Sequence, residues 1–329
     1  MGMKAASTML VPAPVIDRTT LERSTVVAMM GVEPIEHLLS EGCDVILTGR
    51  TSDTALFAAL PDMLGAAPGL NWHAAKTVEC GAACAIPPTA GGLLTRIRSD
   101  HFTVETLDPG SRLTPRSVAA HTLYENADPY RITEPAGVLD TRHAAYEAID
   151  ERTVRVSGAR FDLAAEYSMK LEGAELVGYQ TVIVGGIRDS VVMRRLPELI
   201  KMAQQYFADR IDDLFGGTVT PQDIDIDYRI YGAGAVCLTD ETFDEFPHEM
   251  GVVIIVTGPD QEIAHKVATF VAHVSSHLPI LEYDGLVTTI AYPFSPPEID
   301  RGALYAFTLN HVVRPVRPTE LVRTLIKEI

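Results

Sequence analysis

Residues 43–53, with the sequence CDVILTGRTSD, carry the strongest fold signal in the chain. Residues 44–48 form a short apolar run rich in branched side chains, which is typical of a strand buried on both faces. Gly49 allows a tight turn, and Thr51, Ser52 and Asp53 are residue types that favour the start of a helix. The stretch therefore predicts a strand, a turn and an apolar helix that runs to about residue 60.

The predicted turn is also a candidate anion site. A strand that enters a helix through such a turn directs free backbone N–H groups toward one point, which suits a carboxylate or a phosphate. Arg50 adds a bidentate donor beside Thr51 and Ser52, and Asp53 can accept a proton or a hydrogen bond. A structural Arg50–Asp53 pair that only braces the turn explains the same residues equally well.

The residues on either side of this stretch predict a mainly parallel sheet layered with helices. Residues 25–30 have the pattern of a strand, and residues 33–41 that of a helix closed by Gly42. With the strand at 43–48 they form a strand–helix–strand unit, the connection that is typical of parallel strands.

A second turn of the same design is expected near residue 185. A strand over residues 180–184 is followed by two glycines, then by Arg188 and Asp189. We expect Arg188 to converge with Arg50 on one anion pocket, although ordinary turn chemistry also explains both turns.

Length and composition predict a two-domain globular protein. The 329 residues are 47% hydrophobic and 22% charged, as in an ordinary packed chain. We expect an N-terminal arm over residues 1–24 and an α/β domain over residues 25–217. A C-terminal α+β sandwich of ferredoxin-like size follows over residues 221–329, and it ends in a helix from Thr319.

The charge and the cysteines of the chain indicate which partners and which cellular compartment to expect. The formal net charge of −17 argues against a nucleic-acid partner, because binding to phosphates needs a basic surface. No apolar stretch approaches the roughly 18–20 residues of a membrane span. The four cysteines are too scattered for a disulfide framework. A cytoplasmic protein fits best.

The helix expected over residues 72–81 carries three polar groups at helical spacing. His73, Lys76 and Glu79 lie three residues apart, so one face holds an imidazole, an ammonium and a carboxylate. Such a face is more often a solvated surface. A functional role requires that it turn toward residues 49–53.

A second candidate pair lies on the helix that Thr114 and Pro115 begin. His121 and Glu125 are four residues apart, so the carboxylate can orient the imidazole for proton transfer. A surface contact accounts for the same spacing.

The sequence predicts no metal site and no cofactor. Of His265, His273 and His277, only the last two share a helical face, and no carboxylate stands beside them. A Gly-rich nucleotide fingerprint and a Gly-x-Ser-x-Gly elbow are both missing from the sequence.

Several longer motifs carry a resemblance to a known family. Together they cover most of the chain, and it resembles the acyclic terpene utilisation AtuA family. The motifs are VAMMGVEP (27–34), DVILTGRTSD (44–53), WHAAKTVECG (72–81), SVAAHTLYENADP (117–129), KLEGAE (170–175) and PFSP (293–296) with Tyr305.

The resemblance implies a catabolic setting near enzymes that handle acyl-CoA esters or small branched and dicarboxylic acids. Members of the family have a sizeable N-terminal α/β portion before the stretch that matches Val27. We therefore expect either that a separate chain supplies this portion or that this is a short variant.

Two functions stay open. The first is a hydratase-type lyase or an isomerase acting on a small carboxylic acid or its CoA ester. Arg50 and Arg188 would hold the carboxylate, and His121 with Glu125, or Glu79 beside Lys76, would transfer the proton. The second is a non-catalytic subunit or assembly partner of an acyl-CoA-handling complex. In either case we expect a homo-oligomer or a complex with another chain.

Overall fold

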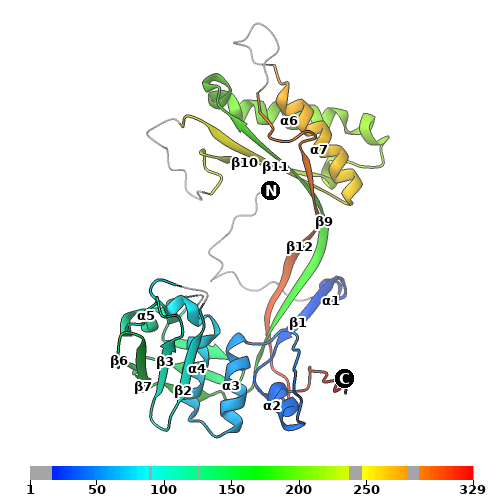
Figure 1. Ribbon diagram of the computed structural model, residues 1–329. Helices are drawn as coiled ribbons and strands as arrows, with labels where there is room; N and C mark the ends of the chain where they lie inside the picture. Colours follow the sequence, from blue (N-terminus) through cyan, green and yellow to red (C-terminus); the bar gives the residue numbers. More distant parts are fainter. Residues whose placement is uncertain (1–16, 89–90, 125, 237–246, 280–288, 329) are drawn as a thin grey trace. The chain divides into compact units, whose positions relative to one another are not determined.

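The computed structural model describes residues 17–88, 91–124, 126–236, 247–279 and 289–328. These residues fall into two compact units, whose elements are labelled in Figure 1. The C-terminal unit is Ala174–Phe307. The N-terminal unit is Val15–Gly173 together with Thr308–Ile329. The units divide the chain at different positions from the domains predicted above.

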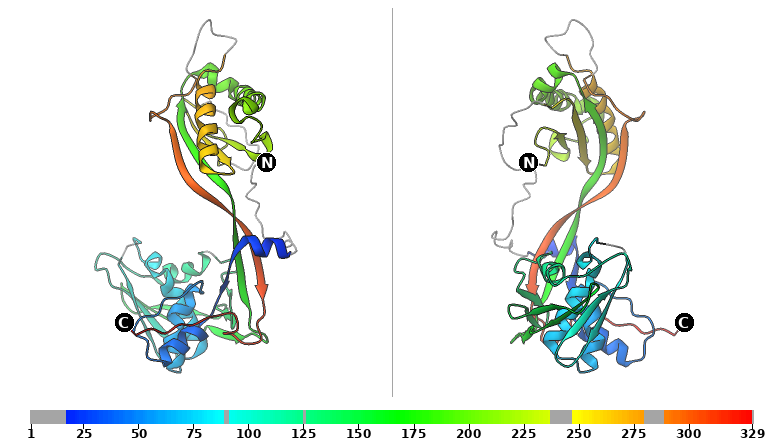
Figure 2. Two further views of the ribbon diagram at one scale, coloured as in Figure 1. Left: turned by 90° about the vertical axis from the view of Figure 1, so that its right-hand side faces the viewer. Right: turned by 60° about the vertical axis from the view of Figure 1, so that its left-hand side comes forward.

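The C-terminal unit has the element order β-α-β-β-α-β, which is the order of ferredoxin-like folds. Its strands have the order β12-β9-β11-β10, and the views in Figure 2 show β12 beside β9. The sheet has a fifth strand, β1 (Ser24–Met29), which also pairs with β9. The first residues of β9 and the last residues of β12 belong to the N-terminal unit. The elements are β9 (Met169–Ile187), α6 (Ser190–Phe215), β10 (Asp225–Tyr231), β11 (Met250–Gly258), α7 (Gln261–Ser276) and β12 (Glu298–Val313).

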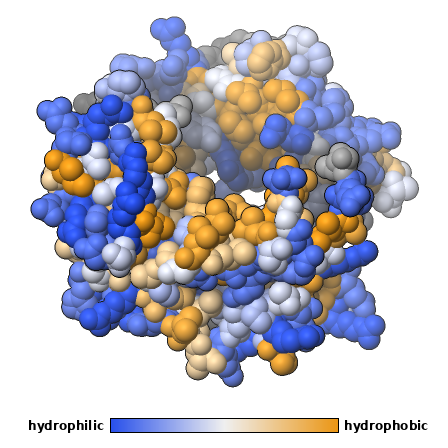
Figure 3. Space-filling view, turned by 60° about the horizontal axis from the view of Figure 1, so that its bottom comes forward, coloured by the Kyte–Doolittle hydropathy of each residue, from blue (hydrophilic) through white to orange (hydrophobic). Residues whose placement is uncertain are grey.

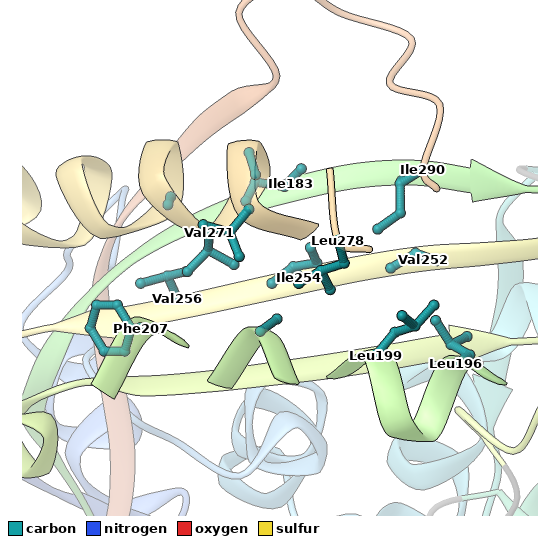
Figure 4. Packing of buried hydrophobic residues seen from close by; sticks show 14 of the residues in the cluster. Ile183, Leu196, Leu199, Phe207, Val252, Ile254, Val256, Val271, Leu278 and Ile290 are labelled. Atoms are coloured by element: carbon teal, nitrogen blue, oxygen red, sulfur yellow. The ribbon is translucent and has the colours of Figure 1, made fainter. Parts of the chain in front are cut away.

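Alternating apolar residues on the strands and helical spacing on α6 form the core of this unit. Ile254 and Val256 on β11 are fully buried, as is Ile183 on β9. Figure 4 shows Val256 beside Phe207 of α6 and Ile183 beside Val271 of α7. The core therefore lies between one face of the sheet and the two helices.

The N-terminal unit begins with short helices around a small apolar core. Ala55, Ala58 and Ala59 of α3 are buried against Trp72 and Ala75 of α4, because small side chains allow the two helices to pack closely. The elements are α1 (Arg18–Arg23), β1 (Ser24–Met29), α2 (Glu33–Ser40), α3 (Asp53–Met63) and α4 (Pro68–Glu79).

The rest of this unit consists of two small antiparallel sheets. One has the order β2-β3-β7-β6 and the other has the order β4-β5-β8. In the chain, the helical turn η1 precedes β2, and α5 and the helical turn η2 lie between β3 and β4. The elements are η1 (Gly81–Cys84), β2 (Leu93–Ile97), β3 (Phe102–Thr106), α5 (Pro115–Ala120), η2 (His121–Leu123), β4 (Arg131–Glu134), β5 (Gly137–Asp140), β6 (Ala145–Ala148), β7 (Thr153–Ser157) and β8 (Arg160–Leu163), with a further turn, η3 (Pro221–Asp223), in the C-terminal unit.

The prediction of a mainly parallel sheet is wrong. The ladders that join β2, β3 and β7, those that join β4, β5 and β8, and those that join β9, β10 and β11 are antiparallel. Parallel pairing among the described residues is limited to an isolated bridge between Met30 and Thr51. Strands that are close in the sequence pair as hairpins here, and a hydrophobic pattern does not show which strand a neighbour will pair with.

Residues 43–53, which carry the strongest fold signal in the sequence, do not contain the predicted strand. Residues 43–48 have no regular secondary structure, and Leu47 is 92% exposed. After this run, an isolated bridge joins Thr51 to Met30, the residue that follows β1, and Ser52 N–H donates to the carbonyl of Met30 over 2.9 Å. A strand needs a neighbouring strand to accept and donate its backbone hydrogen bonds. Among the described residues, residues 43–48 form no bridge to such a neighbour.

Two further expectations are also wrong. The strand before Arg188 does not end in a glycine turn, because β9 continues through Gly185 and Gly186 to Ile187 and Gly186 pairs with Gly251. The C-terminal residues after Thr319 form turns and irregular chain rather than a helix.

Within the described residues, the longest helices are too short or too polar to cross a membrane.

Candidate functional site

The N-terminal unit holds a group of polar side chains that meet where α3, α4, η2 and β4 approach one another. We call this group the acid–base cluster. Its members are Ser52, Thr54, Lys76, Glu79, His121 and Glu134.

Glu134 is the most deeply buried acid of the cluster. It is the last residue of β4, directly before the hairpin turn into β5, and only 6% of it is exposed. Ser52, which precedes α3, donates its hydroxyl to Glu134 Oε2 over 2.5 Å. Burial raises the pKa of the Glu134 carboxyl, while the hydrogen bond from Ser52 and the charge of Lys76 act in the opposite direction. A raised pKa is the property that a general acid needs near neutral pH.

The second acid of the cluster, Glu79, is held in place from two sides. Lys76, one helical turn earlier on α4, forms an ion pair with Glu79 Oε1, and Thr54 of α3 donates to Glu79 Oε2 over 2.6 Å. The environments of the two acids therefore differ. Glu79 is balanced by an ammonium, whereas Glu134 is mainly desolvated. Two carboxyls in such different surroundings are typical of acid–base sites.

His121 adds an imidazole to the cluster. Burial lowers its pKa, and among the smaller influences are the opposing charges of Glu79 and Lys76 and a hydrogen bond with the backbone of Lys76. The ring is also stacked with Tyr124 at a centroid distance of 6.4 Å. Burial favours the neutral imidazole, and the neutral form is the one with a ring nitrogen that can accept a proton.

A tyrosine and a third acid extend the cluster toward α2. The Tyr167 hydroxyl donates to Glu33 Oε2 over 2.8 Å and accepts from Gly31 N–H over 3.0 Å. A Cβ atom added at Gly31 would lie 2.7 Å from that hydroxyl, so this close approach requires glycine. Burial is the main cause of the raised pKa of Tyr167, and the charges of Glu33 and Glu134 raise it further.

A cavity of about 290 Å³ opens beside Glu134. Other residues in its lining are Ser168, Lys170 and His311, all of which belong to the N-terminal unit. This volume lies at the lower end of the range for small-molecule sites, so it suits a compact acid rather than a whole coenzyme A ester.

A chain of charges lies next to the cavity. Glu172 accepts from Arg50 Nε over 2.6 Å and from Lys170 Nζ over 2.8 Å. The hydrogen bonds from these two cations help to lower the pKa of Glu172, against the effect of burial. The pair predicted between Arg50 and Asp53 is thus replaced by a pair between Arg50 and Glu172, which is 122 residues away in the sequence.

The structure brings together several of the predicted site residues. Lys76 and Glu79 face Thr54, so the polar face of α4 does turn toward the start of α3. Thr51 is buried beside Ser52, and its hydroxyl donates to the carbonyl of Gly49 over 3.2 Å.

Other predicted residues lie elsewhere. His73 is in the hydrophobic core, where its Nε2 lies 3.3 Å from the Tyr146 hydroxyl and its ring meets that of Phe102 edge to face. Asp53 is exposed at the start of α3. Glu125 lies outside the described residues.

Arg188 and Asp189 belong to the C-terminal unit. Asp189 is the N-cap of α6 and accepts from Val191 N–H and Val192 N–H. Arg188 is exposed just before it. Arg50 lies in the other unit, so a pocket shared by the two arginines stays a prediction.

Sequence reasoning missed Glu134, Tyr167 and Lys170. One signal for Glu134 exists in the sequence: it is two residues from Ile132, so a carboxyl lies on the apolar face of a strand. No local pattern distinguishes Tyr167, whose partners Gly31 and Glu33 come from a distant part of the chain. Lys170 begins the motif KLEGAE and pairs with Glu172 two residues later, but only packing places it in the lining of the cavity.

The described residues include no group of three or more histidine, cysteine, aspartate or glutamate side chains with the geometry to hold a metal ion. The acid–base cluster itself places two acids and an imidazole beside an ammonium. These are groups that can donate, accept and relay a proton.

Comparison with known proteins identifies the family of the chain. No curated protein and no solved structure matches the chain. The model of the family described as acyclic terpene utilisation family protein AtuA matches residues 6–85 and 101–288, which is most of the chain. The chain therefore belongs to the AtuA family, whose description implies a role in acyclic terpene utilisation.

Proposed function

We propose that the N-terminal unit binds a small carboxylic acid and transfers a proton at the carbon beside its carboxyl group, as a hydratase-type lyase or an isomerase does. One observation carries this proposal. Glu134, a buried acid with a raised pKa, lines a cavity that is also lined by the cation Lys170.

Each part of the site has a role in the proposal. Lys170 and Arg50 attract the substrate carboxylate, which replaces Glu172 as the partner of these two cations. Glu134 donates the proton to carbon or removes it, and the Ser52 hydroxyl positions the carboxyl. The Glu79–Lys76 pair and His121 form the path by which the proton returns. A positioned acid or base of this kind contributes about 10²–10⁴-fold in rate.

A binding screen tests the first part. The melting temperature of the full chain is measured with small mono- and dicarboxylic acids of three to six carbons and with their coenzyme A esters. A ligand that binds only the folded protein raises the melting temperature. Lys170→Ala should remove the shift, while Arg96→Ala should keep it, because Arg96 pairs with Glu105 on the β2–β3 hairpin. Failure of every acid to shift the melting temperature would contradict the proposal.

Hydrogen exchange tests the chemistry directly. In D₂O, the protein should catalyse deuterium incorporation at the carbon beside the carboxyl of a bound acid, followed by NMR. Glu134→Gln keeps the size of the side chain and one oxygen that can accept from Ser52, but it cannot transfer a proton, so it should slow this exchange by about 10²-fold or more while binding persists. Exchange at the wild-type rate in this variant would show that Glu134 is not the acid.

We also propose, as a second candidate, that the chain is a subunit of an acyl-CoA-handling complex and binds another protein. An exposed apolar surface on α3 and at its C-cap favours it: Phe57, Leu60 and the C-cap residue Leu64 are 45%, 53% and 78% exposed. Residues of the preceding segment, among them Val45 and Leu47, are exposed as well. Figure 3 shows orange apolar residues at the surface between polar ones. Clusters of exposed apolar residues on a protein surface commonly mark an interface.

Two sets of substitutions distinguish the two candidate functions. Leu60→Glu with Leu64→Glu should abolish co-elution with a partner in size-exclusion chromatography and leave the melting shift by acids unchanged. Arg50→Ala should weaken acid binding and leave co-elution intact. If each of the two variants lost both acid binding and co-elution, the two candidate functions would not be independent and this prediction would be contradicted.

A further inference from the structure

The C-terminal unit contains a groove of about 890 Å³ along α7. None of the residues that line it belongs to the acid–base cluster. Leu214 and Phe270 supply apolar surface, and the polar residues that matter below are Gln261, His265 and Asp300.

An aspartate–histidine dyad is built into this groove from three elements. Asp300 of β12 accepts three hydrogen bonds on one oxygen, Oδ1. The partners are the Thr181 hydroxyl of β9 at 2.8 Å, Gln261 Nε2 at 3.0 Å and His265 Nδ1 at 2.9 Å. The hydrogen bond with His265 is the main reason why the pKa of Asp300 is lowered, so Asp300 is a carboxylate that only accepts.

The dyad has a defined orientation. Gln261 Oε1 accepts from Gly302 N–H over 3.0 Å, which directs the amide nitrogen of the same side chain toward Asp300. Because the carboxylate accepts, neutral His265 carries its proton on Nδ1. The hydrogen bonds of the described residues leave its Nε2 as an acceptor, and the His265 side chain is 46% exposed.

The remaining charges in the groove disfavour an anion. The Lys266 ammonium is already engaged: it donates to the Leu214 carbonyl over 2.6 Å and lies 4.7 Å from the centre of the Phe215 ring. Glu262 and Asp300 add negative charge to the lining. An anion would be repelled by these two carboxylates. A cation would be attracted by them and repelled by Lys266, so the hexylamine arm of the test below decides between a neutral and a cationic ligand.

We propose that this groove binds an uncharged molecule made of an apolar chain and one hydroxyl group. The hydroxyl donates to His265 Nε2, and the chain lies against Phe270 and Leu214. Asp300 is a positioning residue, since it holds the imidazole in the tautomer that accepts. This site is independent of the acid–base cluster, and either proposal can fail alone.

The test compares four probes of one length: 1-hexanol, methyl pentyl ether, hexanoate and hexylamine. Dissociation constants for the full chain are measured by ligand-observed NMR at pH 8. One hydrogen bond corresponds to about a 3–10-fold preference for the alcohol over the ether. His265→Phe keeps an aromatic ring without the acceptor and should abolish this preference, and Asp300→Asn should reduce it.

Two measurements keep the outcome clear. His101→Phe is the matched control, because His101 forms the same kind of pair with Asp100 in the N-terminal unit over 2.7 Å and should not affect binding. In the wild type, 1-hexanol should move the ¹⁵N resonance of His265 Nε2, which does not depend on the folding of any variant. Equal binding of alcohol and ether, tighter binding of hexanoate or hexylamine, or an unmoved His265 resonance would overturn the proposal.

Discussion

At the scale of single residues, His73 shows how the core uses a polar side chain. The ring is buried, and its Nδ1 has no hydrogen-bond partner in the described part of the chain. Burial lowers its pKa to about 4, well below the ordinary value of 6.5. The folded protein therefore holds a neutral imidazole, while the unfolded chain takes up a proton below pH 6.5.

This linkage predicts a loss of stability in acid. Because the pKa is lower in the folded state, the free energy of unfolding is highest above pH 6.5 and falls as the pH drops toward 4, by up to about 3 kcal/mol. His73→Phe should flatten this part of the pH profile, measured as urea midpoints between about pH 4 and pH 8. A variant with the wild-type slope would contradict the assignment.

Glu36 predicts the opposite pH dependence in the same unit. Burial, and then the neighbouring Asp62, raise its pKa to about 7 from 4.5. Its contribution is complete below pH 4.5 and is lost as the pH rises through 7. Since Glu36 is only half-buried, screening reduces the effect to about 1 kcal/mol. Glu36→Gln should therefore raise the urea midpoint at pH 8 and change little at pH 4.5, whereas Glu41→Gln, on an exposed residue after α2, should alter neither.

At the scale of elements, β9 and β12 approach too closely at Gly173 for any side chain. A Cβ atom there would lie 2.7–2.9 Å from three atoms of Leu309, a residue that is 1% exposed. Gly173→Ala should therefore lower the free energy of unfolding by about 1–3 kcal/mol through overpacking.

A double-mutant cycle measures this contact. Leu309→Ala removes two of the three close atoms and leaves only the Leu309 Cβ, 2.9 Å from the added methyl group, so the cost of Gly173→Ala should fall in its presence without vanishing. Gly49→Ala is the matched control, because a Cβ atom added at Gly49 would meet nothing within 4 Å and the urea midpoint should stay nearly unchanged. Additive effects of the two substitutions would show that the close approach is not the cause.

At the scale of the whole molecule, the two units have separate hydrophobic cores. The single tryptophan of the chain, Trp72, is buried in the N-terminal unit and stacks on Phe161 with ring centroids 4.8 Å apart. Its fluorescence therefore reports on one unit, while circular dichroism reports on both.

Ile254→Ala removes a fully buried side chain of the C-terminal unit and should cost that unit about 2–5 kcal/mol. The unfolding transition seen by circular dichroism should broaden or split, and the fluorescence midpoint should stay in place. Leu139→Ala in the other core should move the fluorescence midpoint instead. Equal shifts by both probes would indicate one cooperative unit.

The sequence by itself determined the family, through motifs spread over most of the chain, and it predicted part of the candidate site. The polar face of α4 and the residues before α3 were predictable, because spacing along a helix and N-cap chemistry are local properties. Lys76, Glu79 and Ser52 accordingly lie in the cluster. The buried position of Glu134 was also within reach of strand alternation.

Only the tertiary structure decided how the strands pair and which side chains meet. The apolar run at 43–48 has the composition of a buried strand, yet it forms no strand and Val45 and Leu47 are exposed, since pairing depends on a neighbour that composition does not identify. In the same way, Arg50 pairs with Glu172 rather than with Asp53, and Ser52 bonds Glu134 across 82 residues. Contacts between residues so far apart arise from packing, and a local pattern carries no information about them.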